Sequence, residues 1–175
     1  MSEENSRGLN GVSNNETLLR ELKLQASRFS ICDIMKIRTY MVNNVQNLPE
    51  KYRKIYSVDL FEYLYRTLQE IKCAEIMDTK VTIDQNKLRE TNACIDKLAM
   101  AEHTEKMITC FFRTVTLYLI FIGNKPIHPL GMQFPGKLEI LSRNGDYFCP
   151  AKEKQSEIEI SLCKFCICKD CNEFK

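Results

Sequence analysis

The end of the chain holds the residues with the clearest potential for chemistry. The stretch "CKFCICKDC", residues 163–171, contains two Cys-x-x-Cys pairs, Cys163 with Cys166 and Cys168 with Cys171. Such a turn lets two thiolates point at one ion, and a tetrahedral zinc ion takes four ligands of this kind. We therefore predict a metal site in this segment.

Two residues further upstream complete the predicted ligand set. Cys149 lies on the return strand of a predicted hairpin, which would bring it beside the Cys-x-x-Cys turns. His128, one of only two histidines, lies in the loop before that hairpin. Cysteine sulfur and histidine nitrogen are the usual zinc donors. The predicted ligands are Cys149, Cys163, Cys166 and His128, with Cys168 or Cys171 as substitutes.

The identity of the metal has an alternative. Four thiolates also suit an iron–sulfur cluster, and Cys149-Pro150 resembles the Cys-Pro of ferredoxin sequences. Ferredoxin cysteines are spaced more regularly than these, so we favour zinc. No His-Glu-x-x-His pattern is present, so a structural ion is expected rather than a catalytic one.

The composition describes an ordinary globular chain. It has 175 residues, 44% of them hydrophobic, and a formal net charge of +2. This balance argues against a strongly basic nucleic-acid binder, although "KYRKIYS" mixes bases with tyrosines and keeps nucleic acid as a secondary hypothesis. Nine cysteines without a secretion signal indicate a cytoplasmic protein. Cys32, Cys73, Cys94 and Cys110 fall singly on predicted helices, where we expect packing roles.

One apolar segment, residues 107–123, could be mistaken for a membrane span. It is shorter than the ~20 apolar residues that a span needs, and Arg113 lies inside it. We predict a buried helix of a protein without membrane association. The first 15 residues, "MSEENSRGLNGVSNN", are polar and are predicted to form a disordered tail.

Apolar residues recur at three- and four-residue steps through most of the first 124 residues, which predicts helices. Ser30 with Asp33, and Thr82 with Gln85, are spaced as capping boxes. Asp59 and Thr104 are predicted to cap two further helices, a short helix is expected after Pro49, and Gly123-Asn124 is a typical helix stop.

The pattern changes after residue 124. Asn144-Gly145 predicts a two-residue turn in a β-hairpin, with Leu138 and Ile140 on one strand face. Alternation in residues 157–162 predicts a third short strand or an extended lead-in. The expected fold is mainly α: a bundle of about five helices over residues 16–124, then a hairpin and cysteine-rich metal knuckle over residues 125–175, packed as one domain. The last ~40 residues are too few to fold without such a staple.

Several motifs together resemble an archaeal family. The chain is similar to small proteins of methanogenic archaea catalogued as a domain of unknown function, from about Leu18 to Cys166. The matching residues are His128-Pro129, Gly131, Phe134-Pro135-Gly136, Leu138, Tyr147, Cys149-Pro150, Lys154-Gln155, Cys163 and Cys166. The resemblance implies an archaeal cytoplasmic protein, brings no activity with it, and groups His128 with the three cysteines. Cys168 and Cys171 depart from the family pattern.

The functional interpretation follows from the site. No phosphate-binding loop, dinucleotide fingerprint or serine elbow is present, so the sequence leans away from an enzyme. We expect a cytoplasmic protein with a structural zinc-type Cys/His site that binds a protein partner. The alternative is an iron–sulfur redox or cluster-handling protein.

Overall fold

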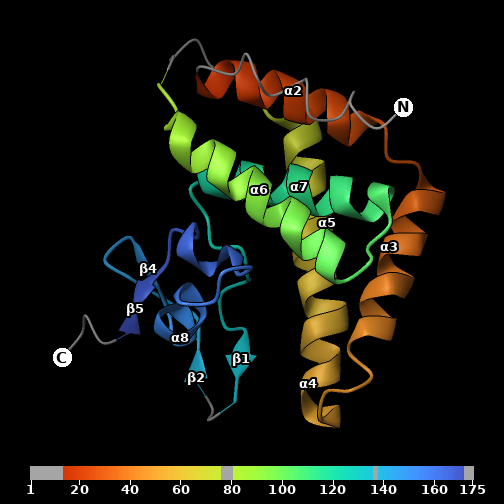
Figure 1. Ribbon diagram of the computed structural model, residues 1–175, viewed down its shortest axis with the longest axis vertical. Coiled ribbons are helices and arrows are strands. Elements are labelled where there is room, and N and C mark those ends of the chain that lie inside the picture. Colours follow the sequence, from red (N-terminus) through yellow and green to blue (C-terminus); the bar gives the residue numbers. More distant parts are fainter. Residues whose placement is uncertain (1–13, 76–80, 136–137, 172–175) are drawn as a thin grey trace.

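The computed structural model describes residues 14–75, 81–135 and 138–171 and is mainly helical (Figure 1). The helices are α2 (Asn15–Ser27), α3 (Ile31–Asn44), α4 (Glu50–Lys54), a π-helix (Ile55–Asp59), α5 (Leu60–Cys73), α6 (Gln85–Ala101) and α7 (Lys106–Phe121). The C-terminal part contains β1 (Gln133–Phe134), β2 (Leu138–Glu139), β3 (Leu141–Arg143), β4 (Asp146–Cys149), α8 (Lys152–Ser156), a 3-10 turn (Leu162–Lys164) and β5 (Lys169–Asp170).

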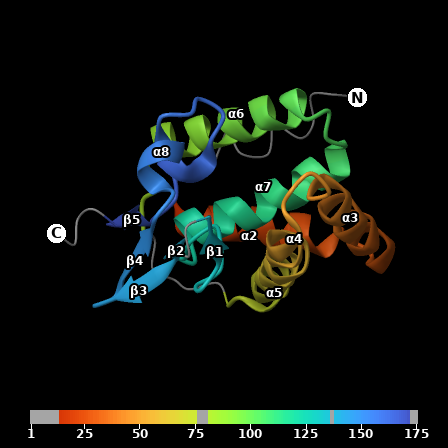
Figure 2. The same cartoon turned by 90° about the horizontal axis from the view of Figure 1, so that it is seen from below.

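These elements lie in two neighbouring regions. The helices α2 to α7 make up one region, and the short strands with α8 lie beside it, on the side of α6 (Figures 1 and 2). Small strand pairs rather than one large sheet organise the second region: β1 pairs with β2, and β3, β4 and β5 form a three-stranded sheet. We call these two regions the bundle, residues 14–125, and the C-terminal region, residues 126–171.

Helix α7 lies at the centre of the bundle. Phe111, Val115, Leu117 and Leu119 have no exposed surface, and α7 packs against α2, α5 and α6. A helix that is apolar on all sides must be buried, which explains this position. Arg113 inside the same helix forms an ion pair with Asp96 of α6. Among the helices of the described segments, none has the length and hydropathy needed to cross a membrane.

Two predicted helix ends are confirmed. Ser30 and Asp33 form a capping box, in which the Ser30 hydroxyl accepts from the Asp33 N–H and the Asp33 carboxylate accepts from the Ser30 N–H. Asn124 at the end of α7 has a positive φ of 46°, as a left-handed stop requires. The predicted tail falls mostly on residues 1–13, outside the described residues. Its last two residues, Asn14 and Asn15, belong to the start of α2.

Three predicted caps are wrong. Asp59 has helical backbone angles and makes no capping hydrogen bond, because α4 continues through the π-helix into α5 without a break. Asp84, not Thr82, caps α6, with its carboxylate accepting from the N–H groups of two following residues. Thr104 lies before α7, and its hydroxyl bonds to the Tyr40 hydroxyl at 3.1 Å. Helix continuation removed the expected cap at Asp59, Asp84 is a stronger neighbouring acceptor than Thr82, and Thr104 makes a tertiary contact instead.

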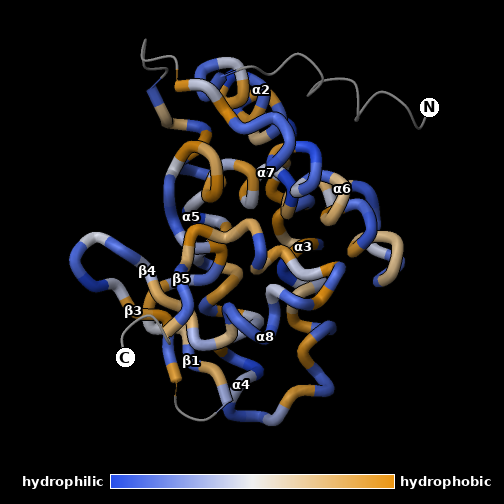
Figure 3. The backbone as a smooth tube through the Cα atoms, turned by 60° about the vertical axis from the view of Figure 1, so that its left-hand side comes forward, coloured by the Kyte–Doolittle hydropathy of each residue, from blue (hydrophilic) through white to orange (hydrophobic). Residues whose placement is uncertain are grey.

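The predicted turn of the hairpin is confirmed, but the predicted assignment of side chains to one strand face is wrong. Asn144 and Gly145 both have positive φ, and β3 pairs with β4 on either side of them. Figure 3 shows that this turn projects from the molecule and is hydrophilic. Leu138 and Ile140 do not share a face, since Ile140 is buried and Leu138 is exposed. The strand breaks at Ile140, whose N–H and C=O bond instead to Met132 and Gly131.

The third strand lies elsewhere than predicted. Residues 157–160 form turns that follow α8, and the strand that joins the hairpin is β5, which runs parallel to β4. A two-residue strand carries too short an alternation to be recognised by its period. This parallel pairing brings the end of the chain beside Cys149, because Asp170 is its partner in the register.

The C-terminal region docks on the bundle through apolar and polar contacts. Phe165 packs with Cys94 of α6 and Ile120 of α7 in a small buried cluster. The Tyr63 hydroxyl of α5 donates to the carbonyl of Pro126 at 2.6 Å. Lys97 of α6 forms an ion pair with Glu159. These contacts fix the position of the cysteine-rich segment relative to the helices.

Candidate metal centre

Four cysteines and the predicted histidine line one cavity in the C-terminal region. The cavity measures about 380 Å³ and is bordered by His128, Cys149, Lys152, Cys163, Cys166 and Cys168. It lies where β4, β5, α8 and the 3-10 turn meet, beside α6 (Figure 2). Three of the predicted ligands therefore come from the C-terminal strands and turns and the fourth from the loop that leaves the bundle.

The local structure explains how Cys149 and Cys168 reach this cavity. Both are buried, with 6% and 4% of their surface exposed, and both pack with Met132 and Ile140. Cys149 ends β4 and Cys168 directly precedes β5, and the pairing of these two strands brings both cysteines into the same buried cluster. This delivery of Cys149 by the return strand of the hairpin agrees with the sequence prediction.

Cys163 and Cys166 lie on a tight turn that is bonded within itself. The Ser161 hydroxyl accepts from the Cys163 N–H at 3.2 Å, and the Cys166 N–H donates to the carbonyls of Leu162 and Cys163, both at 3.2 Å. Lys152 of α8 clamps the turn from outside. Its ammonium donates to the Cys166 carbonyl at 2.9 Å and also to that of Cys163.

Backbone N–H groups face two of the sulfurs. The N–H of Ala151 is directed at the Cys149 thiol, two residues before it. The N–H groups of Cys168, again two residues on, and of Ile127 are directed at Cys166. Such donors stabilise the charged thiolate, which is the form that binds metals.

The pKa values of the thiols differ with these surroundings. Burial raises the pKa of Cys149 to about 11, and repulsion between thiolates at Cys163, Cys166 and Cys171 and one at Cys149 acts in the same direction. The hydrogen bond from the Cys168 thiol lowers the pKa of Cys166 to about 6, aided by the backbone donors and the Lys152 ammonium. Burial raises the pKa of Cys163, so Cys166 is the thiol of this group that loses its proton most readily.

His128 is a neutral base at the wall of the cavity. Burial lowers its pKa to about 4, and its ring packs edge-on against Phe134 with centroids 6.2 Å apart. No hydrogen bond to the imidazole is found within residues 14–75, 81–135 and 138–171. A neutral imidazole with a free nitrogen is the form that binds a metal.

The predicted ligands share a cavity but do not form an assembled coordination sphere. Within the described part of the chain, no three His, Cys, Asp or Glu side chains are grouped closely enough to hold an ion. All nine cysteines are free thiols. The metal knuckle of the sequence prediction is therefore not seen as such, and what the structure brings together is the set of donors.

The positions of the remaining cysteines and of Lys152 differ in part from the sequence predictions. Cys94 is buried as predicted, whereas Cys32 and Cys73 are exposed and do not pack in the core. Cys171 does not border the cavity, although its charge still acts on Cys149. Sequence reasoning missed Lys152. Its position three residues after Cys149 was the only signal, and a single lysine at that spacing indicates nothing by itself.

This architecture defines a class of small, mainly helical proteins with a cysteine-rich C-terminal end. The model of a family described as "Uncharacterized protein conserved in archaea (DUF2115)" matches residues 14–171. The chain belongs to this family, and the resemblance noted in the sequence is confirmed.

Curated relatives from methanogens agree with this assignment. A UPF0305 protein of Methanococcus maripaludis strain C7 is 36% identical over 163 residues, which cover 91% of this chain and 99% of the relative. A UPF0305 protein of Methanocaldococcus jannaschii is 36% identical, covering 90% and 97%. One from Methanothermobacter thermautotrophicus is 28% identical, covering 86% and 92%. No solved structure matches the chain.

Proposed function

We propose that the C-terminal region is a metal-binding module in which Cys149, Cys163 and Cys166 hold a structural zinc ion. The observation that carries the proposal is the single cavity bordered by these three cysteines, Cys168 and His128. Thiolate and imidazole donors are the set that zinc prefers. Since the donors are near but not assembled, the ion would draw them together and close the region.

The surroundings of the cysteines support this proposal. Zinc–thiolate sites carry excess negative charge, which outer hydrogen bonds and cations must balance. The Ala151, Cys168 and Ile127 N–H groups and the Lys152 ammonium are available for that purpose. Lys152 already bonds to the carbonyls of the Cys163–Cys166 turn, so it would also hold the turn in place.

The fourth ligand is either His128, as the sequence predicts, or Cys168. His128 offers a neutral imidazole, and Cys168 is buried beside Cys149 and bonds to Cys166. The two assignments differ in the number of sulfur ligands, four or three. Replacing each in turn, His128→Ala and Cys168→Ser, distinguishes them, because only loss of the true ligand releases the metal.

The test is metal analysis of protein purified without oxygen. We expect one zinc per chain in the wild type and its loss in Cys149→Ser and Cys163→Ser. Cys32→Ser is the matched control, because Cys32 is exposed on α3 and lies outside the cavity, so its zinc content should stay unchanged. A wild type without zinc or iron, whose melting temperature a chelator does not change, would contradict the proposal.

An iron–sulfur cluster is the second candidate, favoured by the fourth thiol at the cavity. Four cysteines border it, and four thiolates are the usual ligands of such clusters. The same anaerobic preparation decides between the two, because a cluster gives a brown protein with iron and sulfide, whereas zinc gives a colourless one.

The role that this site supports best is structural and belongs to a binding protein rather than an enzyme. The ligands available would surround the ion with protein donors, which leaves no position for a substrate. An ion there would fix the C-terminal region on the bundle and shape whatever surface the two regions present jointly to a protein partner.

A further inference from the structure

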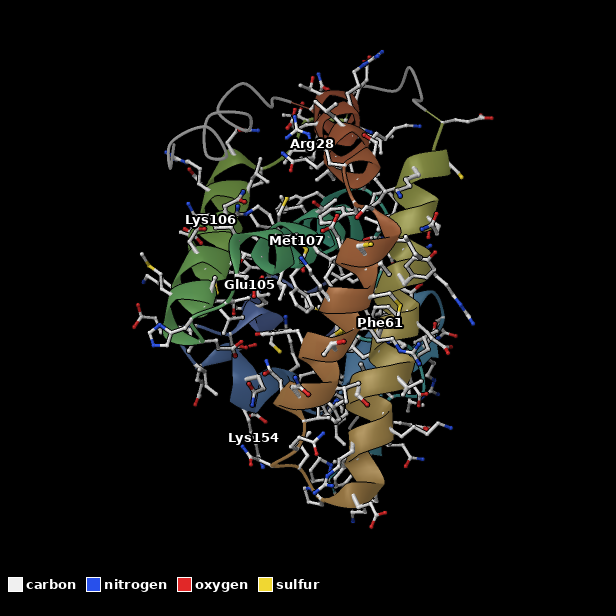
Figure 4. The ribbon with its side chains drawn as sticks, turned by 90° about the vertical axis from the view of Figure 1, so that its right-hand side faces the viewer. Arg28, Phe61, Glu105, Lys106, Met107 and Lys154 are labelled. Atoms are coloured by element: carbon white, nitrogen blue, oxygen red, sulfur yellow. The ribbon has the colours of Figure 1, made fainter. Side chains whose placement is uncertain are left out.

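A second cavity, of about 360 Å³, lies between the bundle and the C-terminal region, next to the cavity of the cysteines. Most of its wall comes from α3, α5, α6 and α7 and is apolar, including Met41, Leu60, Leu64, Ile95 and Phe112. The volume falls within the range of about 300–1,000 Å³ that is usual for small-molecule sites. Figure 4 looks at the side of the molecule where α3 and α5 run next to each other, with the C-terminal region below α6 and α7.

One threonine at this cavity has a hydroxyl without a hydrogen-bond partner among the described residues. Five Ser and Thr residues are buried in the described segments: Ser57, Thr67, Thr91, Thr114 and Thr116. The first four each donate to the carbonyl four residues earlier in their helix. Thr116 is 3% exposed, borders the cavity, and makes no hydrogen bond with any described residue.

The position of Thr116 on its helix is consistent with a role toward the cavity. Thr109, Phe112 and Thr116 all border it and are spaced by three and four residues, so they lie on one face of α7. Thr116 is not among the residues with a fully buried, unpartnered side-chain atom, which within the described segments are Asn92 and Arg113, so its hydroxyl keeps some accessible surface. It can therefore donate a hydrogen bond to a molecule that enters the cavity.

Two further polar groups border the same space near the cysteine site. Tyr56 and His128 both pack edge-on against Phe134, with ring centroids 6.4 Å and 6.2 Å from it, and both line the cavity. Neither makes a hydrogen bond with the described residues. Tyr56 lies in the π-helix Ile55–Asp59, and such wide turns are often found at functional sites.

The charges around the cavity restrict what it can hold. Among the described residues that line it, Glu102 is the only Asp, Glu, Lys or Arg, and it accepts a hydrogen bond from the Tyr40 hydroxyl at 3.1 Å. No Lys or Arg of the described segments borders the cavity. An anion would find no counter-charge there, whereas an uncharged molecule would lose nothing on entering.

We propose that this cavity binds a small, uncharged, mainly apolar molecule that accepts a hydrogen bond from Thr116. Its apolar body lies between α3, α5, α6 and α7, and its far end reaches Tyr56 and His128. Leu98, Ile127, His128 and Leu162 border both cavities, so the bound molecule ends next to the cysteine site. The proposal does not depend on a metal in that site.

The test uses Prodan, an uncharged naphthyl ketone whose fluorescence shifts to shorter wavelength in apolar surroundings. Its aromatic body and single carbonyl acceptor match the wall of the cavity. We expect saturable binding at one site per chain of the full-length protein. Anilinonaphthalene sulfonate, an anion with a similar ring system, is the matched probe and should bind at least tenfold more weakly.

Two pairs of variants locate the probe. Ala99→Phe, on α6 at the cavity wall, should weaken binding roughly tenfold or more by filling the space. Ala93→Phe, at an exposed position of the same helix, should leave binding unchanged. Thr116→Val should weaken Prodan binding about 3- to 10-fold, the value of one hydrogen bond. Thr114→Val, whose hydroxyl is already paired, should leave it unchanged.

Stability provides a second measurement that does not require the probe. Thr116→Val removes a hydroxyl that has no hydrogen-bond partner among the described residues and should keep or raise the melting temperature, whereas Thr114→Val removes a paired hydroxyl and should lower it. The proposal is overturned if Prodan does not saturate, if Ala99→Phe binds it as the wild type does, or if the anionic probe binds equally well. Failure of the metal proposal would instead appear as absent zinc and iron with Prodan binding intact.

Discussion

The bundle and the C-terminal region are held together by different means. The bundle has a continuous core of nineteen buried residues between Leu18 and Leu119, with α7 running through its centre. One small buried cluster in the C-terminal region consists of Met132, Ile140, Cys149 and Cys168, and two of these four residues are thiols. Hydrophobic stabilisation increases with the apolar area that is buried, so the core of the bundle is large enough to stabilise the bundle. The C-terminal region needs additional stabilisation from its contacts with the bundle or from a metal.

The two regions combine a stable core with a potentially reactive site in one chain. Thiols buried in the core of the bundle would be shielded from solvent and could not be reached by a metal ion. In the C-terminal region they lie at a cavity, with Lys152 and backbone N–H groups around them. Because the core of the C-terminal region is small, its thiols can lie at the wall of a cavity. Four substitutions test this contrast, beginning with the largest expected effect.

Phe111→Ala should break the bundle itself. Phe111 has no exposed surface and contacts Phe29 and Phe112 edge-on, at centroid distances of 5.8 Å and 5.5 Å. Loss of such a ring costs about 3–5 kcal/mol through lost burial and the cavity left behind. Urea denaturation followed by circular dichroism measures it, with Val81→Ala at an exposed site as control. A loss below about 1 kcal/mol would refute the central role of α7.

Ile140→Ala should weaken only the C-terminal region. Ile140 is 2% exposed and belongs to the small core with Cys149, so its truncation should cost about 2–4 kcal/mol locally. Hydrogen exchange should become faster for the amides of β3 and β4 and stay slow for those of α7. Equal acceleration in both regions would mean that they unfold as one unit, and the contrast drawn above would fail.

Lys152→Met should loosen the Cys163–Cys166 turn. The ammonium bonds to both carbonyls of the turn, and hydrogen bonds to charged groups contribute about 1.5–3 kcal/mol. Lys154→Met on the same short helix is the matched control, because Lys154 is exposed (Figure 4). Limited proteolysis within residues 157–166 measures the effect, and equal cleavage rates for the two variants would argue against the clamp.

Glu70→Gln should have the smallest effect and a dependence on pH. Lys125 and Tyr118 hydrogen-bond to the Glu70 carboxylate at 2.7 to 2.9 Å. Burial acts to raise its pKa, but these hydrogen bonds outweigh it and the pKa lies below the ordinary value of 4.5. Since the pair is well exposed, we expect a loss of at most about 1 kcal/mol at neutral pH.

The sign of this dependence follows from the lowered pKa. The contribution of Glu70 is present above the unfolded-state pKa of 4.5 and is lost as the pH falls through the folded-state value. The difference in unfolding free energy between wild type and Glu70→Gln should therefore be constant from pH 6 to pH 8 and shrink below about pH 4.5. A difference that grows toward acid would contradict this explanation.

The sequence by itself was sufficient for the features that depend on neighbouring residues. Helical periodicity, the Ser30 capping box and the Asn144-Gly145 turn each depend on residues within one or two turns of chain, and the structure confirms them. The spacing of the cysteines also predicted that Cys163 and Cys166 lie near Cys149, and all three border one cavity, although the metal site itself stays a prediction. Local conformational preference and short-range hydrogen bonding are physically encoded in such short segments.

Only the tertiary structure decided the features that depend on distant partners. Asp59 lost its expected cap because α4 and α5 continue into one another, and Thr104 bonds to Tyr40 of another helix. The parallel pairing of β4 with β5, the lysine that clamps the cysteine turn, and the unpaired Thr116 at a cavity all arise from packing between segments far apart in the chain. Contacts of this kind have no local period, and they exist only once the core has fixed where each helix lies.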